Sequence, residues 1–267
     1  MMKNFNHYFE TNKNTWNNKV KAHIESDFYN LNDFKKGKSS LNSYEKKALP
    51  DVQGKSLLHL QCHFGQDTLS WNRLGAKCVG VDISNEAIDM AKKLNNELNL
   101  TSQFVCCNVL DTSTYIKEVF DIVYTSYGVI GWLPNLNPWG RMIAERLKSG
   151  GTFYMVEFHP IVWMFDYIKD VPKMRYGYMQ DEVIYEEFKG TYANKNSKIK
   201  SKEYGWNHGL SEVVNALIEA GLRIDYLNEH DESPYDVLPE LMKTKSGNYI
   251  TKDKLYPLIF EIKATKF

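Results

Sequence analysis

Five short apolar segments recur between residues 56 and 158, and stretches with helical spacing separate them. The segments cover 56–62, 77–83, 103–109, 120–126 and 151–158. Each is apolar almost throughout, which is typical of strands that are buried on both faces of a sheet. Strands that alternate with helices predict an α/β fold, in which helices cover both faces of a parallel sheet and the connections are right-handed.

Helix signals fill the intervals between these strands. A helix over 67–74 is expected to end before Gly75, because glycine favours helix ends. Ser84 is expected to cap a second helix, in which apolar residues recur at helical spacing. A third helix is predicted over 138–148, and the glycine pair at 150–151 stops it.

The rest of the chain divides into an N-terminal segment and additions to the main domain. Residues 1–50 are polar with scattered aromatic residues, and we expect a helical lid there. Residues 51–267 are predicted to form the main domain, with an aromatic-rich insertion at 160–205 that includes a β-hairpin over 182–204. A helix over 211–220 is expected to follow.

That last helix is expected to bury one apolar face, and two closing strands come after it. The residues of the face are Val213, Val214, Leu217 and Ile218. The strands are predicted over 222–227 and 258–265, with a loop between them.

Composition narrows the possible partners. The chain carries 33 Lys and Arg against 33 Asp and Glu, so its formal net charge is zero. Proteins that bind nucleic acid or anionic membranes usually carry a basic excess, so neither partner is expected. No segment resembles a secretory signal or a membrane span, which needs about 20 mostly apolar residues. Four cysteines without a C-x-x-C pair indicate free thiols in a reducing cytoplasm.

Polar residues gather where four of the predicted strands end. Ligands of an open parallel sheet bind beside the carboxyl ends of its strands. The sequences there are HLQCHFGQD from residue 59, VDIS from 81, CCNVLD from 106 and YTSYG from 124. Together with RLKSGGTFYMVEF from residue 146, they resemble the class I S-adenosylmethionine-dependent methyltransferases.

The resemblance covers residues 56–158 well and the C-terminus in outline. It implies a three-layer sandwich around a seven-stranded, mostly parallel sheet whose last strand is antiparallel. It also implies S-adenosyl-L-methionine as the cofactor. The absence of a basic surplus and the sequence TSYG after the fourth strand disfavour a nucleic-acid substrate, and we expect a small molecule as the methyl acceptor.

The loop after the first strand departs from the family pattern of an acidic residue and three glycines. His59 stands at the acidic position, Gln61 and His63 replace two glycines, and Gly65 remains. A dinucleotide-binding loop needs the glycine pattern G-x-G-x-x-G, because the backbone must approach the pyrophosphate closely. Since Gln61 and His63 occupy two of these positions, a dehydrogenase is disfavoured. S-adenosylmethionine has no phosphate, so Gln61 and His63 could instead bind its amino-acid group.

Further cofactor contacts follow from the other strand ends. Asp82, about 20 residues after the start of the loop, could accept hydrogen bonds from both ribose hydroxyls; capping of the next helix is the alternative, and Ser84 suits that better. Asn108 could bind the adenine amino group, although a turn at a strand end explains it equally well. By family position, five more residues are expected at the cofactor: Ile83, Val109, Thr125, Ser126 and Tyr127.

Residues on the acceptor side are less constrained by the pattern. An oxygen acceptor would need a general base, for which His159 is the first candidate and Glu157 the second. The candidates for the acceptor wall are Trp16, Tyr29, Trp163, Trp206 and His208, and each also has a purely structural explanation. No metal is expected, because His59, Cys62 and His63 do not share a face and no second cluster has ligand spacing.

The sequence is compatible with two functions. The first is in-line methyl transfer to a small-molecule acceptor. The alternative is a non-catalytic module that binds S-adenosylmethionine or a nucleotide on the same fold, which the altered glycine pattern would allow.

Overall fold

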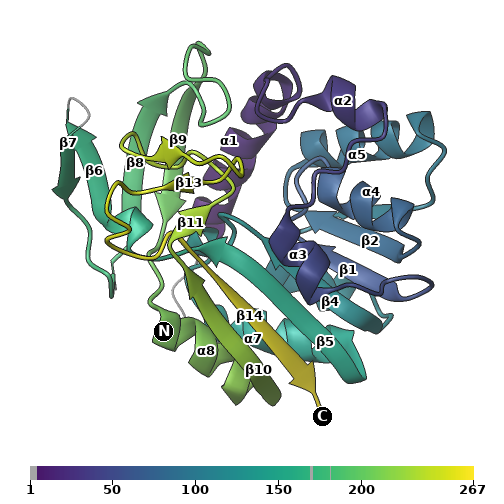
Figure 1. Cartoon of the computed structure of the whole chain (residues 1–267). Helices are drawn as coiled ribbons and strands as arrows, with labels where there is room; N and C mark the ends of the chain where they lie inside the picture. Colours follow the sequence, from purple (N-terminus) through teal and green to yellow (C-terminus); the bar gives the residue numbers. More distant parts are fainter. Residues whose placement is uncertain (1–4, 169–170, 181) are drawn as a thin grey trace.

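The computed structural model describes residues 5–168, 171–180 and 182–267. Its centre is a seven-stranded sheet (Figure 1), in which β14 runs antiparallel to both of its neighbours and the other pairs are parallel. This confirms the predicted sheet and its antiparallel last strand. The order across the sheet is β10 (Leu222–His230), β14 (Ile259–Lys266), β5 (Leu147–Phe158), β4 (Phe120–Ser126), β1 (Ser56–Leu60), β2 (Lys77–Asp82) and β3 (Gln103–Cys106).

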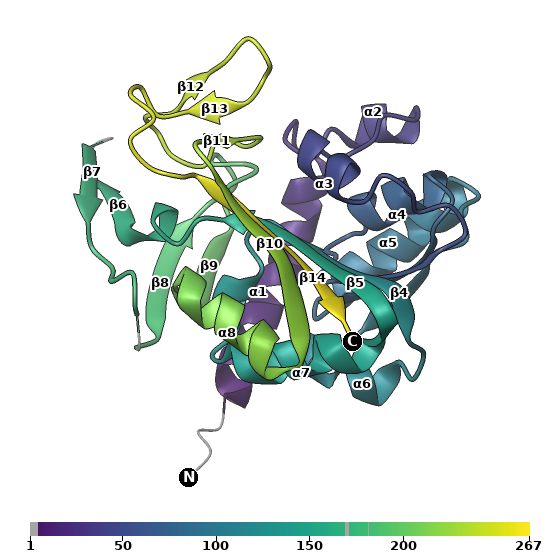
Figure 2. The ribbon, with the colours of Figure 1, turned by 60° about the horizontal axis from the view of Figure 1, so that its bottom comes forward.

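Helices cover both faces of this sheet (Figures 1 and 2). On one face, α7 (Leu136–Arg146) and α8 (Leu210–Glu219) bury residues such as Trp139 and Leu217 against the strands. On the other face lie α3 (Ser43–Ala48), α4 (Gln66–Arg73) and α5 (Asn85–Glu97). Burial of these apolar faces supplies the main favourable free energy of folding. Three layers result, as the sequence predicts.

The residues that begin and end helices lie where the sequence analysis predicts them. The Ser84 side chain accepts a hydrogen bond from the Ala87 amide and caps α5. Gly75 follows α4 with φ +91°, and Gly221 follows α8 with φ +86°, a region that favours glycine. These local signals fix where each helix meets the sheet.

Several boundaries differ from the sequence prediction. Strand β3 ends at Cys106, since Asn108 instead caps the short 3₁₀ helix η1 (Val109–Asp111). Strand β5 begins at Leu147 rather than at Gly151. Gly150, with φ +75°, lies at an irregularity in the pairing of β5 with β4, and the strand continues through it. On α8, Ile218 is 53% exposed, so the prediction that it belongs to the buried face is wrong.

The additions to the sheet gather on one side of α1 (Asn6–Ile24), while α2 (Leu31–Lys35), α4 and α5 lie on the other (Figures 1 and 2). The predicted hairpin is present as β8 (Ile184–Lys189) and β9 (Lys200–Gly205). A second hairpin pairs β6 (Phe165–Ile168) with β7 (Val171–Met174).

The stretch predicted as a loop between the closing strands forms a small sheet. Its strands are β11 (Glu232–Ser233), β12 (Met242–Lys243) and β13 (Tyr249–Ile250). The remaining short helices are α6 (Thr112–Tyr115), η2 (Ile130–Trp132) and η3 (Val162–Met164). None of the helices in the described part of the chain combines the length and apolar character that a bilayer crossing needs.

Candidate active site

The loop between β1 and α4 turns tightly at the carboxyl edge of the sheet. Gln61 (φ +53°), His63 (φ +51°) and Gly65 (φ +80°) all adopt left-handed backbone conformations. At Gly65, a Cβ atom would lie 2.7 Å from the Phe104 ring, so glycine is required there for space as well as for conformation. Non-glycine residues in this region are uncommon and tend to mark functional sites.

His59, at the position where the family pattern is acidic, belongs to the core. Its Nδ1 lies 2.8 Å from the Thr68 hydroxyl and joins β1 to α4. Burial lowers the pKa of His59 to about 3, so the ring is neutral. This histidine faces α4 rather than the loop.

Asp82 ends β2 directly beside this loop. Its Oδ2 accepts a hydrogen bond from the His63 amide at 2.8 Å, and its Oδ1 accepts one from the Ser84 amide at 2.9 Å. Burial raises the pKa of Asp82 to about 6, while the backbone amides oppose that rise. Each carboxylate oxygen has capacity for another hydrogen bond. The carboxylate is therefore fixed in place and able to accept bonds from two hydroxyls.

The side chains of Gln61 and His63 leave buried polar atoms without partners. Gln61 donates from Nε2 to the Val129 carbonyl at 2.8 Å, and its Oε1 has no partner among the described residues. His63 Nε2 lies 3.2 Å from Nδ1 of His23, whereas His63 Nδ1 has no described partner. Buried polar groups are rarely left unpaired, and such exceptions point to a bound group.

The His23–His63 pair is neutral. Burial, followed by the charge of Lys19, lowers the pKa of His23 to about 3, and burial also lowers the pKa of His63. A neutral imidazole has one donor and one acceptor. Once one N–H joins the two rings, the pair keeps one donor and one acceptor, at His63 Nδ1 and His23 Nε2. It can therefore bind a group that both donates and accepts.

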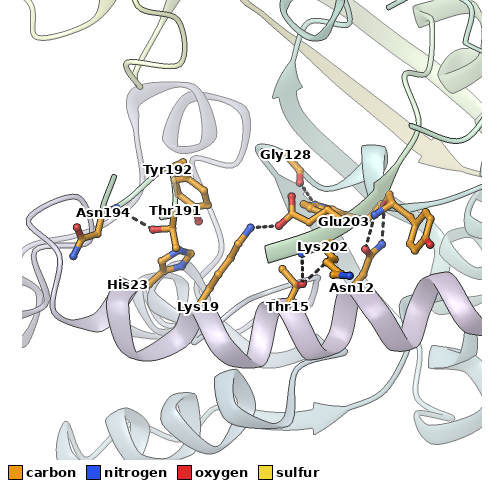
Figure 3. A network of polar contacts seen from close by, with 12 residues as sticks. Asn12, Thr15, Lys19, His23, Gly128, Thr191, Tyr192, Asn194, Lys202 and Glu203 are labelled. Carbon is orange, nitrogen blue, oxygen red and sulfur yellow. Dashed lines mark hydrogen bonds and ion pairs between the residues drawn. The ribbon is translucent and has the colours of Figure 1, made fainter. Parts of the chain in front are cut away.

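Helix α1 contacts the loop through Trp16 and His23. Different elements hold its two sides, and Figure 3 shows the contacts on the side of the β8–β9 hairpin. On the hairpin side, Asn12 exchanges hydrogen bonds with the Tyr204 backbone, Thr15 donates to the Lys202 carbonyl, and Lys19 pairs with Glu203. On the sheet side, the Ser84 hydroxyl donates to Asn17 at 2.7 Å. The N-terminal segment and the insertion thus meet over the loop.

Trp16 and Tyr29, two candidates for the acceptor wall, both contact the loop. The Trp16 ring lies 5.4 Å from that of His63, edge on, and 5.3 Å from that of Trp132. The Tyr29 ring stacks on His63 at 5.4 Å with an angle of 3° between the planes. Both aromatic side chains therefore close over the proposed cofactor loop.

The residues after β4 point in different directions. Thr125 is fully buried and donates from its hydroxyl to the Leu60 carbonyl, which joins β4 to β1. Ser126 donates to Asp67 at 3.3 Å. Tyr127 has φ +26°, donates its amide hydrogen to the Val156 carbonyl and holds a buried hydroxyl without a described partner. Thr125 therefore belongs to the core, Ser126 contacts the first turn of α4, and Tyr127 packs beside Phe158 and Tyr235.

The residues proposed for adenine lie at the ends of β2 and β3. The Asn108 side chain accepts a hydrogen bond from the Leu110 amide at 3.0 Å, so the turn-forming role that the sequence allowed is present. The capping oxygen leaves the Asn108 amide nitrogen as a donor. Val109 packs in the core beside α7, and the Ile83 carbonyl accepts from the Cys106 thiol.

Glu157 and His159, the two general-base candidates, have structural partners. The Glu157 carboxylate is almost fully buried and accepts hydrogen bonds from the amides of Gly128, Val129 and Phe158. His159 uses both ring nitrogens: Nε2 lies 2.8 Å from Glu229, and Nδ1 accepts from the Ile161 amide. The structure favours positioning roles for both, with Glu157 holding the loop that carries Tyr127.

The other acceptor-wall candidates are dispersed. Trp163 is 43% exposed and packs on Phe158. Trp206 packs against Tyr8 near the start of α1. His208 bridges the Leu133 carbonyl and Glu212. Of these three, Trp163 is the one that packs on Phe158, the last residue of β5.

Sequence reasoning missed several residues that the fold brings to this edge. His23 and Lys19 come from α1, Glu45 from α3 and Tyr235 from the segment after β11. None follows a strand of the regular pattern, so no local signal marks it. Asp67 lies within the quoted stretch after β1, and its position at the start of α4 was the one available signal.

Comparison with known proteins agrees with this geometry. A family model described as "Methyltransferase domain" matches residues 58–155, the region from β1 to β5. An uncharacterized methyltransferase of Synechocystis sp. is 30% identical over 114 residues, which are 42% of this chain and 51% of that protein. The chain therefore matches about half the length of this curated relative.

Residues 58–155 therefore match a methyltransferase domain. Solved structures show the same fold: a protein of Listeria monocytogenes assigned to the S-adenosylmethionine-dependent methyltransferases superposes with a TM-score of 0.60, at 19% identity, over 84% of this chain and 96% of its own. The glycopeptide N-methyltransferase MtfA, complexed with S-adenosyl-L-methionine, superposes with a TM-score of 0.54 at 13% identity over 84% and 92% of the two chains.

Proposed function

We propose that the chain transfers a methyl group from S-adenosyl-L-methionine to a small-molecule acceptor. The observation that carries the proposal is the Asp82 carboxylate, which two backbone amides fix at the end of β2. Beside it, Gln61 and His63 present buried polar atoms without described partners. A ribose and an amino-acid group together would satisfy these groups.

Each part of the cofactor has a candidate partner. Asp82 would accept hydrogen bonds from the ribose, with Ile83, Asn108 and Val109 along the adenine. Gln61 and His63 would bind the amino-acid group where the chain turns at Gly65. Ser126 and Tyr127, where β4 ends, would border the reacting end. The bound cofactor supplies a methyl group that its sulfonium activates.

This chain's own contribution would be position and the exclusion of water. Trp16 and Tyr29 close over the loop, and the α1–β9 contacts hold that cover in place. A covered site keeps acceptor and methyl group aligned for in-line displacement and shields them from solvent. Such a covered site suits a small acceptor better than a polymer. Four unpaired cysteines suit a reducing compartment such as the cytoplasm.

The experiment is calorimetric titration of S-adenosyl-L-homocysteine into three versions of the chain. Asp82→Asn keeps the shape and removes the charge, and we expect affinity to fall about tenfold to a hundredfold, the effect of losing charge-assisted hydrogen bonds worth roughly 1.5–3 kcal/mol. Asp89→Asn removes the same charge from an exposed position of α5 and should leave affinity unchanged. Equal affinity of the Asp82→Asn variant and the unmodified chain would refute the ribose assignment.

A further inference from the structure

Two acidic side chains lie beside the proposed cofactor site and have no role in the function described so far. Glu45 comes from α3, and Asp67 comes from the first turn of α4. Glu45 is 0% exposed, and no described donor meets ordinary hydrogen-bond geometry with either carboxylate oxygen. The Asn42 side chain and the Tyr127 hydroxyl are nevertheless close enough to lower its pKa against the effect of burial. Asp67 receives long hydrogen bonds from the hydroxyls of Ser126 (3.3 Å) and Tyr124 (3.5 Å), and the Ser40 side chain also lowers its pKa.

The pKa values of both carboxyl groups are raised, as expected for buried acids without a neighbouring cation. Burial and the nearby charge of Asp67 raise the pKa of Glu45 to about 8, and burial raises the pKa of Asp67. The main influences on both pKa values include no lysine or arginine. Burying a polar group without a partner lowers the stability of the fold by about 1–3 kcal/mol. A buried carboxyl with weak partners therefore points to a bound ligand.

Aromatic rings border the same region. The buried hydroxyl of Tyr127 has no described partner, and burial together with the Glu45 charge raises its pKa. The Tyr235 ring lies 4.9 Å from the Tyr127 ring, and burial, Asp67 and Glu45 raise its pKa. The Phe158 ring lies 5.6 Å from the Tyr127 ring. Aromatic faces and carboxylates are the groups that bind organic cations.

The region lies toward the acceptor side of the edge. Tyr127 and Phe158 stand at the ends of β4 and β5, and Asp67 contacts Ser126 at the end of β4. Asp82, Asn108 and the other residues proposed for ribose and adenine stand at the ends of β2 and β3, on the opposite side of β1. Groups next to β4 and β5 therefore suit the acceptor better than the nucleoside.

We propose that Glu45 and Asp67 bind the ammonium group of the methyl acceptor, so that the acceptor is a cationic amine held among Tyr127, Tyr235 and Phe158. The inference rests on the proposed function, because it names the substrate class of that same site. Attraction between opposite charges is strong where water is excluded. A cation would also give the buried Glu45 carboxyl an opposite charge, which is absent from the main influences on its pKa.

The test compares two probes of matched shape by calorimetry in the presence of saturating S-adenosyl-L-homocysteine. The probes are 2-phenylethylammonium chloride and 2-phenylethanol. We expect the unmodified chain to bind the ammonium at least tenfold more tightly than the alcohol, and Glu45→Gln to abolish that preference. Asp51→Asn, which removes a charge from an exposed side chain just after α3, should keep it. Asp67→Asn provides a second variant that should lose it.

The two proposals fail in different ways. If S-adenosyl-L-homocysteine does not bind the unmodified chain, the proposed function fails. If it binds but the ammonium is bound no more tightly than the alcohol, or not at all, the amine proposal is overturned and the proposed function stands. The amine proposal is also overturned if Glu45→Gln weakens S-adenosyl-L-homocysteine binding and leaves the probe preference intact, because the carboxyl would then serve the cofactor.

Discussion

The buried carboxyl of Glu45 makes a quantitative prediction about stability. Burial and Asp67 raise its pKa from 4.5 to about 8 in the folded chain. A carboxyl whose pKa is raised by folding binds its proton more tightly in the folded state. Its contribution to stability is therefore fully present below the unfolded pKa of 4.5, and it is lost as the pH rises through the folded pKa of about 8.

The magnitude follows from the difference between the two pKa values. One pKa unit corresponds to about 1.4 kcal/mol, so complete ionisation of Glu45 lowers the free energy of unfolding by about 5 kcal/mol. Since the unfolded chain is already ionised at pH 7, most of this loss occurs between pH 5 and 8. Glu45→Gln removes the titration and keeps nearly the same shape, so the variant should escape the loss.

Urea denaturation at pH 5, 7 and 9, followed by tryptophan fluorescence, measures this difference directly. Glu45→Gln should match the unmodified chain at pH 5 and exceed its unfolding free energy by several kcal/mol at pH 9. Groups that do not interact with Glu45 titrate equally in both proteins and cancel in the comparison. Parallel stability curves for the two proteins across this range would show that Glu45 is paired or solvated in the folded chain, and the reasoning would be refuted.

Three further predictions concern the loop and its supports. Affinity for S-adenosyl-L-homocysteine, measured by calorimetry, should fall below pH 6, where Asp82 (pKa about 6) gains a proton, and Asp82→Asn should flatten that dependence. In urea denaturation, Gly65→Ala should lower the free energy of unfolding by about 1–3 kcal/mol more than Gly54→Ala. Both glycines have positive φ, but only at Gly65 would the added Cβ meet a side chain, and equal losses would contradict this. Glu157→Gln should lower the unfolding free energy by about 1–3 kcal/mol, since its amide would face backbone donors, and an unchanged urea midpoint would count against the role in the loop.

The central sheet was predictable from the sequence because each strand and helix there carries its own signal. Strand β4 has the predicted bounds, and Ser84 caps α5 as expected. The exceptions are local. The glycine pair at 150–151 indicated a helix stop, but Gly150 lies inside β5, where only the pairing with β4 shows that the strand continues.

The site was predictable only where residues follow strands. Asp82 is at a position that the order of strands fixes, and the structure places it beside the loop of His63. Glu45, His23 and Tyr235 reach the same edge from segments without strand periodicity, so tertiary packing alone brings them there. Glu157 follows the strand pattern, and its position at a strand end suggested a general base. The backbone amides that bond to its carboxylate come from the loop after β4, and only the folded structure shows them.

A crystal structure of the chain with S-adenosyl-L-homocysteine tests the central claim most directly. The account predicts a ligand at the carboxyl edge of β1 and β2, with its ribose hydroxyls within hydrogen-bond distance of Asp82 and its amino-acid group beside Gln61 and His63. It also predicts that the sulfur faces Tyr127 on the side of β4. A ligand bound elsewhere, or a ribose that does not contact Asp82, would contradict the account.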